Sequence, residues 1–175
     1  MGIICIDADD FHEGNHKLPV LEKLHANTGM LFTLFVIPGL CSSSFISEVK
    51  KIPWIDLVPH GWLHPTSREC EKWTYLKSKT YLECMDFMGL TKGFRAPGWQ
   101  ISSGMYQALL EHGYWVSDQH YNDDRRPPLL KVFHHRDEHH FHIGHTGGFN
   151  QNEIEIHLER LMDLKGDFRF IKDIV

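Results

Sequence analysis

The stretch that decides the fold is the start of the chain, where residues 2–10 read GIICIDADD. An uninterrupted apolar run is typical of a strand that is buried on both faces, as in a parallel sheet. Gly2–Ile6 form such a run, and acidic residues follow it at once. We therefore predict a buried strand that carries Asp7, Asp9 and Asp10 at its C-terminal tip.

Short apolar runs continue along the chain and alternate with helical periodicity. Helices are expected at residues 16–26, 44–50, 66–88, 103–112 and 150–164, and further strands at 30–37, 55–58, 93–95, 114–117, 130–134, 140–144 and 168–175. Thr66 and Glu69 have the spacing of a capping box that would open the longest helix. Repeated strand–helix units predict an α/β fold with a mostly parallel sheet, open or closed into a barrel. In such folds the chemistry gathers at the C-terminal tips of the strands.

Composition limits the class of protein. The 175 residues suit a single domain over the whole chain, and 42% of them are hydrophobic, enough for a sizeable core. The formal charge of −5 is offset by no basic stripe, which argues against nucleic acid as a partner. No stretch approaches the roughly 20 apolar residues of a membrane span. We therefore expect no membrane partner. The protein is expected in the cytoplasm, with export by a route without a signal peptide left open, and its four cysteines are expected to be reduced. The sequence does not indicate an oligomeric state.

Histidine is the compositional anomaly, with 14 copies, and two of them stand in the motif His60-Gly-Trp-Leu-His64-Pro. A spacing of i and i+4 places two imidazoles on one face of a helical turn, a standard way to present nitrogen ligands to zinc. The alternative is a pair of surface histidines on a loop. Because both follow a predicted strand tip, we favour a metal site.

Asp9 and Asp10 are adjacent, so on a regular strand their side chains would point to opposite sides. One can hold a metal while the other faces a reacting water only if the backbone turns at this point. The alternative is the acid pair of an ordinary turn or helix cap.

Two later clusters also follow predicted strands. Arg95 at a strand tip could orient a carboxylate by bidentate hydrogen bonds, and Trp99 beside it could stack on a sugar ring; the alternative is a Pro-Gly turn with an exposed arginine. His145 ends another strand and could act as a general acid near neutral pH. The neighbouring histidines are expected to face solvent: His134, His135, His139 and His140.

Taken in order, these clusters resemble the motifs of the polysaccharide deacetylase family, also known as the NodB-homology family or carbohydrate esterase family four. Residues 7–10 resemble the family's Thr-Phe-Asp-Asp. Residues 60–65 resemble its His-Ser/Thr-x-x-His-Pro, with Gly61 in place of the hydroxyl residue. Residues 95–99 are similar to Arg-x-Pro-Tyr, and His145 is similar to the histidine that ends the last motif.

The family resemblance implies a fold and a cofactor. The fold would be a distorted (β/α) barrel of about seven strands, in a minimal form. The cofactor would be one divalent metal, with zinc favoured over cobalt, nickel and iron. The metal ligands would be Asp10, His60 and His64.

The same resemblance implies the roles of the remaining site residues. Asp9 would be the catalytic base, Arg95 would hold Asp9, and His145 would protonate the leaving group. The residues expected to bind the substrate are Pro97, Trp99 and Trp62.

These assignments predict a metal-dependent hydrolase that removes acetyl groups from an N-acetylated sugar or polysaccharide, or acts on a related non-peptide C–N bond. Its substrate would be an acetylated glycan or a small amide. One alternative is a catalytically silent protein of the same fold that binds metal or carbohydrate. Another is a metal phosphoesterase, which would need more carboxylates to bridge two metals.

Overall fold

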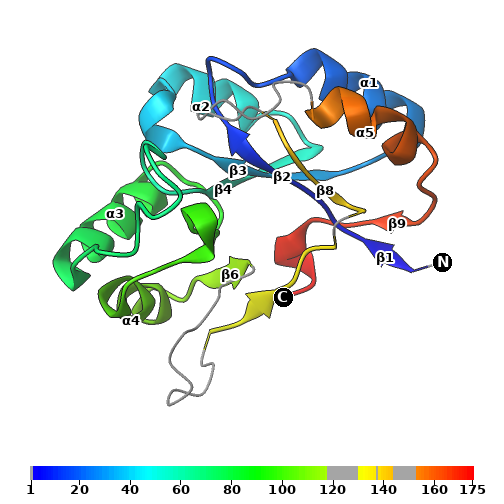
Figure 1. Cartoon of the computed structure of the whole chain (residues 1–175). Helices are drawn as coiled ribbons and strands as arrows, with labels where there is room; N and C mark the ends of the chain where they lie inside the picture. The colour runs from blue at the N-terminus through cyan, green and yellow to red at the C-terminus, as the bar shows by residue number, and fades with distance from the viewer. Residues whose placement is uncertain (1, 118–129, 137, 144–152) are drawn as a thin grey trace.

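A computed structural model of the chain describes residues 2–117, 130–136, 138–143 and 153–175, in which strands and helices alternate (Figure 1). The strands are β1 (Ile3–Ile4), β2 (Ile6–Phe11), β3 (Phe32–Val36), β4 (Ile55–Pro59), β5 (Gly93–Phe94), β6 (Trp115–Ser117), β7 (Val132–Phe133), β8 (His140–His142) and β9 (Asp167–Phe168). The α-helices are α1 (Leu18–Thr28), α2 (Ser43–Val49), α3 (Tyr75–Phe87), α4 (Ser103–Glu111) and α5 (Glu153–Met162). Short 3-10 helices lie at Pro38–Leu40, Pro97–Trp99 and Ile171–Asp173.

The described strands pair in parallel and form three sheets, ordered β4-β3-β2-β8, β5-β6-β7 and β1-β9. Two backbone hydrogen bonds connect the first two sheets: Thr91 N–H donates to Leu57 O (3.0 Å), and Arg95 N–H donates to Pro59 O (3.3 Å). The strands therefore follow one another from β8 through β2 and β3 to β7. Within the described residues no ladder joins β7 to β8. The α/β fold is confirmed, whereas the closed barrel is not.

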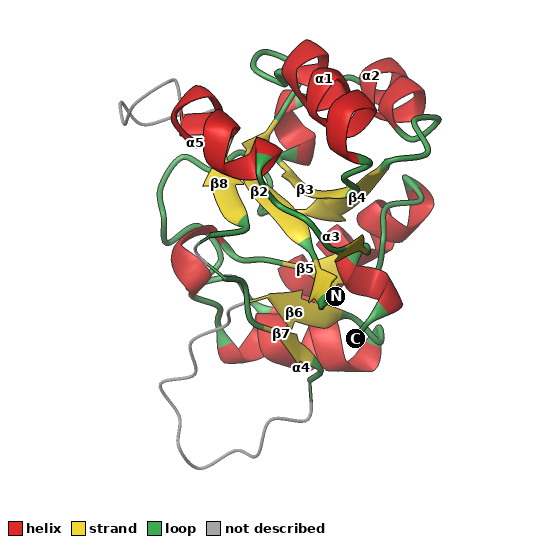
Figure 2. Ribbon diagram, turned by 90° about the vertical axis from the view of Figure 1, so that its right-hand side faces the viewer, coloured by secondary structure: helices red, strands yellow, loops and turns green. Residues whose placement is uncertain are grey.

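The alternation of side chains along the strands separates two cores. Ile6 and Ala8 of β2 pack into the larger core, which lies between the sheets and the helices. Figure 2 shows α1, α2 and α5 on the outer side of the four-stranded sheet. On the inner side, between the two larger sheets, lies a small core of Cys5, Phe35, Val58, Trp115 and Ile171. The polar residues of the site share this inner side.

Three of the expected elements differ from the structure. The helix predicted from Thr66 begins at Tyr75, because Thr74 is its N-cap and accepts from Lys77 N–H, whereas Glu69 has other backbone partners. Residues 168–175 are not a strand beyond Phe168, and a 3-10 helix buries Ile171 there instead. The acidic residues do not follow the first strand but lie within β2.

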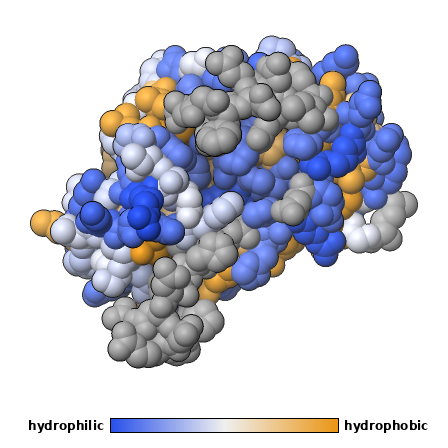
Figure 3. Space-filling model, viewed as in Figure 1, coloured by the Kyte–Doolittle hydropathy of each residue, from blue (hydrophilic) through white to orange (hydrophobic). Residues whose placement is uncertain are grey.

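Hydrophilic residues predominate among the described residues on the side of the molecule that Figure 3 displays. Among the described residues, Trp62 and Leu63 are exposed side by side on one loop, and Leu76 and Phe87 are both exposed on α3. The other large hydrophobic residues that are exposed are Ile3, Leu110 and Ile174. None of the helices in the described part of the chain is both long and apolar enough to cross a membrane.

Candidate metal centre

Three side chains predicted as metal ligands come together in the structure. Asp10 Oδ1 lies 3.7 Å from His60 Nε2 and 3.6 Å from His64 Nε2, and all three side chains are buried or nearly so. These separations are too long for good hydrogen bonds. They are close to the roughly 3.4 Å between two ligand atoms that each lie about 2.1 Å from a tetrahedral zinc. One carboxylate oxygen and two imidazole nitrogens therefore fit a single divalent metal.

Unusual backbone conformations orient two of these candidate ligands, Asp10 and His64. The register of β2 against β3 shifts between Ala8 and Phe11, and Asp10 has a φ of 63°. This bulge turns the strand, so Asp9 and Asp10 can serve one site although they are adjacent. His64 has a φ of 51°, and residues 60–64 are irregular rather than a helical turn, so the expected helical presentation of the two histidines is wrong. Positive φ at non-glycine residues is strained and is typical of functional sites.

The orientation of His60 suits a neutral metal ligand. Its Nδ1 lies 2.9 Å from the carbonyl oxygen of Arg95 and must be the donor there, which leaves Nε2 to face Asp10. Burial lowers the pKa of His60, although the charges of Asp9 and Asp10 oppose the shift. A neutral imidazole is the form that binds a metal.

Arg95, predicted to hold Asp9, is fully buried and donates a hydrogen bond to it. Its Nη1 donates to Asp9 Oδ1 and Asp7 Oδ2, both at 2.6 Å, and its guanidinium also contacts the hydroxyl of Ser117. The guanidinium carbon lies 4.0 Å from the ring centre of Phe35. Burial alone would raise the pKa of Asp9, but the charge of Arg95 holds it well below its usual range. Asp9 is therefore an anion held in place beside the candidate metal ligand His60.

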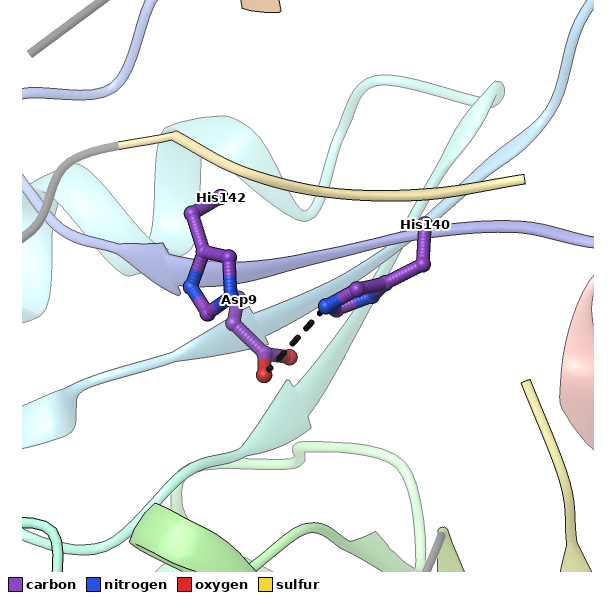
Figure 4. Close-up of side chains that lie close together, drawn as sticks. All are labelled: Asp9, His140 and His142. Atoms are coloured by element: carbon purple, nitrogen blue, oxygen red, sulfur yellow. Dashed lines mark ion pairs between the residues drawn. The ribbon is translucent and has the colours of Figure 1, made fainter. Parts of the chain in front are cut away.

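Sequence reasoning missed two histidines of the site, His140 and His142, which Figure 4 shows on either side of Asp9. His140 Nδ1 lies 2.8 Å from Asp7 Oδ2, and its Nε2 lies 3.9 Å from Asp9 Oδ2. His142 Nδ1 lies 2.9 Å from Asp10 Oδ2. The strict alternation of polar and apolar residues in His140-Phe-His142 was the available signal, because Phe141 belongs in the larger core and the histidines must face the other way.

The solvent-facing patch expected around residue 134 is correct only in part. His134 is exposed, but His139 is buried and His140 is nearly so. Burial lowers the pKa of His139. The strand β8 pairs with β2 and brings this segment to the site, a contact that the local sequence did not indicate.

Asp9, His140 and His142 also lie close enough together to hold a second cation. The guanidinium of Arg95 already occupies the Asp9 side of this cluster, at 2.6 Å from Asp9 and 3.3 Å from His140 Nδ1. A second divalent cation there would face a fixed positive charge at short range. The Asp10 cluster is therefore the better metal site.

The residues expected to bind the substrate differ in their exposure and in their contacts. Pro97 is buried against the backbone of Gly61. Trp99 is half-buried and stacks on His135, with ring centres 6.2 Å apart. Trp62 is 39% exposed on the loop between His60 and His64. His145 lies outside the described residues.

Comparison with known proteins finds similarity in the fold but not in the sequence. No family model and no curated protein matches the sequence. The fold is similar to the Xyl-CE4 domain of a multidomain xylanase from the hindgut metagenome of Trinervitermes trinervoides, with a TM-score of 0.63 at 14% identity over 98% of this chain and 88% of that chain. It is also similar to a family 4 acetyl xylan esterase from Clostridium thermocellum in complex with a cobalt ion (TM-score 0.63, 11% identity, 98% and 89% covered) and to a peptidoglycan deacetylase from Bacillus subtilis (0.61, 11%, 98% and 88%). The resemblance to carbohydrate esterase family four is thus supported at the level of the fold.

Proposed function

We propose that the chain is a metal-dependent deacetylase that acts on an acetylated glycan, or on a related non-peptide C–N bond such as that of a small amide. The observation that carries the proposal is the buried Asp10–His60–His64 cluster next to an Asp9 that Arg95 holds. The similar solved structures, which include an acetyl xylan esterase and a peptidoglycan deacetylase, support the same class of reaction. We favour zinc, although two imidazoles and one carboxylate also suit cobalt, nickel and iron.

Each residue of the proposed site would have its own role in the reaction. The metal, when bound, would polarise the acyl oxygen and lower the pKa of the attacking water. Asp9 would accept the proton of that water, while the hydrogen bond from Arg95 would keep its carboxylate in place. His145, three positions after β8 in the sequence, would donate a proton to the leaving amine or alcohol. Trp62, Pro97 and Trp99 would border the substrate groove, in a protein that we expect to work in the cytoplasm.

The test of the proposal is a metal analysis combined with acetate release from a panel of acetylated glycans. Asp10→Ala and His60→Ala should each lose the bound metal and at least a hundredfold in activity, because removing one of three ligands leaves an incomplete site. His112→Ala, at the end of α4, is the matched control and should change neither. The proposal is wrong if either ligand variant keeps both its metal and its activity.

The low pKa of Asp9 favours one alternative, a silent protein that binds metal or carbohydrate, because a strongly stabilised carboxylate is a weak proton acceptor. Asp9→Asn separates the two functions. In an enzyme it should lower turnover by about 10²–10⁴-fold and leave glycan binding intact. In a silent binding protein it should change glycan binding little, and the wild type should release no acetate.

A further inference from the structure

The loop that carries both histidine ligands is held by a carboxylate from outside the motif. Oε2 of Glu69 accepts hydrogen bonds from the backbone N–H groups of Trp62 and His64, both at 3.0 Å, and its Oε1 accepts one from Leu63 N–H at 3.2 Å. Three consecutive N–H groups that converge on one anion form a nest. Because Glu69 occupies this nest, these N–H groups are not available to bind a substrate oxyanion.

The rest of the loop backbone is also anchored. His60 N–H donates to Val36 O at 2.8 Å, the hydroxyl of Tyr81 donates to Gly61 O at 2.7 Å, and Gly39 N–H donates to Trp62 O at 2.8 Å. Of these contacts, those of Glu69 are the ones that reach the N–H of the ligand His64 itself. They stabilise the positive φ of His64, a backbone conformation that is unfavourable for a residue other than glycine.

Gly61 is the residue that makes room for this carboxylate. Its φ is +65°, and a Cβ built on it would overlap Oε2 of Glu69 and lie 2.8 Å from Cγ of Pro97. Any side chain at position 61 would displace the carboxylate from the nest. The glycine that stands in place of a hydroxyl residue and the glutamate eight residues later are therefore a matched pair.

We infer that Glu69 is a positioning residue of the metal centre, which acts by fixing the backbone of His64, and that Gly61 is required for this role. The inference rests on the proposed function in that it takes Asp10, His60 and His64 as the metal ligands. Groups that orient metal ligands typically contribute about 10–100-fold to metal affinity. The position of His64 Nε2, and so the shape of the site, depends on the backbone that Glu69 fixes.

The experiment measures cobalt binding to the purified 175-residue chain by calorimetry, together with the visible absorption spectrum of the cobalt-saturated protein. Glu69→Gln should weaken cobalt binding by about tenfold or more, because the amide brings a donor against backbone N–H groups. It should also change the cobalt spectrum, which reports the geometry of the ligands. Glu71→Gln removes the same charge two residues away, where the glutamate pairs with Arg68, and should change neither.

A double-mutant cycle tests the link with Gly61. Gly61→Ala should weaken cobalt binding strongly in the wild-type background and less in the Glu69→Ala background, where there is no carboxylate to displace. Hydrogen exchange of the amides of residues 62–64 in the metal-free protein gives a readout that needs no metal, and protection should fall in both Glu69 variants.

Each outcome decides the inference. If the Glu69 variants bind cobalt within twofold of the wild type, with an unchanged spectrum and unchanged amide protection, the positioning role is overturned while the proposed function stands. If the wild type releases no acetate but the Glu69 variants still lose cobalt affinity, the proposed function fails and the positioning role stands. If the wild type binds no cobalt, the metal-site assignment fails and the inference fails with it.

Discussion

Two histidines of β8 contact different carboxylates, which gives them separable roles. His142 contacts Asp10, a proposed metal ligand, whereas His140 contacts Asp7 and faces Asp9. His142→Gln should weaken metal binding by about 10–100-fold, because partners of ligands orient them. His140→Gln should keep metal affinity within about twofold and lower turnover instead, by about 10².

Calorimetric metal titration and the acetate-release rate measure the two effects on the same preparations. Each variant is the control of the other, since the substitution is identical and the positions are two residues apart. Equal losses of metal affinity in both variants would show that β8 acts as a unit and that the separate contacts carry no separate roles.

The acid sensitivity of the protein also depends on single residues. The folded-state pKa of Asp9 is depressed, chiefly by Arg95, so Asp9 contributes stability above its unfolded pKa of about 3.9 and loses it as the pH falls further. We expect the difference in free energy of unfolding between wild type and Asp9→Asn to be constant above about pH 5 and to shrink below about pH 4. Urea unfolding of the metal-free proteins across this range measures the difference. If the difference in free energy of unfolding stayed constant down to about pH 3, this would contradict the low pKa of Asp9 in the folded state.

At the scale of the elements, the helices expected at residues 16–26 and 103–112 lie within two residues of α1 and α4. In the structure Gly29, with a φ of 76°, ends α1, and Ser102 caps α4. The capping box at Thr66 failed because Glu69 binds the backbone of residues 62–64 instead, and no local pattern distinguishes the two uses of a glutamate. The same limit applies to the site: the ligand spacing was visible in the sequence, whereas the contact of Asp7 with His140 joins residues 133 positions apart and follows only from the pairing of β2 with β8.

The pairing of β5 with β6 gives a prediction about an element. A Cβ on Gly93 would overlap the indole ring of Trp115, which lies in the inner core. Gly93→Ala should therefore cost about 1–3 kcal/mol of unfolding free energy, the usual penalty for overpacking. Gly2→Ala is the control, because a Cβ there meets nothing within 4 Å. Urea denaturation of both variants measures the difference, and equal stabilities would mean that the indole ring moves aside without cost.

At the scale of the whole molecule, the C-terminal 3-10 helix fills the space between the two larger sheets. Ile171 is fully buried in the inner core, its N–H donates to the hydroxyl of Thr33 at 3.2 Å, and Lys172 pairs with the buried Asp56 at 2.7 Å. These contacts reach β3 and β4 in one sheet, and the inner core includes Trp115 from the other. The end of the chain therefore couples the sheets that backbone hydrogen bonds connect at β4 and β5.

This coupling predicts that the sheets unfold together and that Ile171 contributes strongly to both. Ile171→Ala should lower the free energy of unfolding by about 2–5 kcal/mol, because it leaves a cavity that the two sheets cannot close without moving their site residues. Ile174→Ala, three residues later and 43% exposed, should cost much less. Thermal unfolding followed by both near-ultraviolet and far-ultraviolet circular dichroism measures stability and cooperativity at once. Two separate transitions in the wild type, or equal losses in the two variants, would show that the C-terminal segment covers the sheets without joining them.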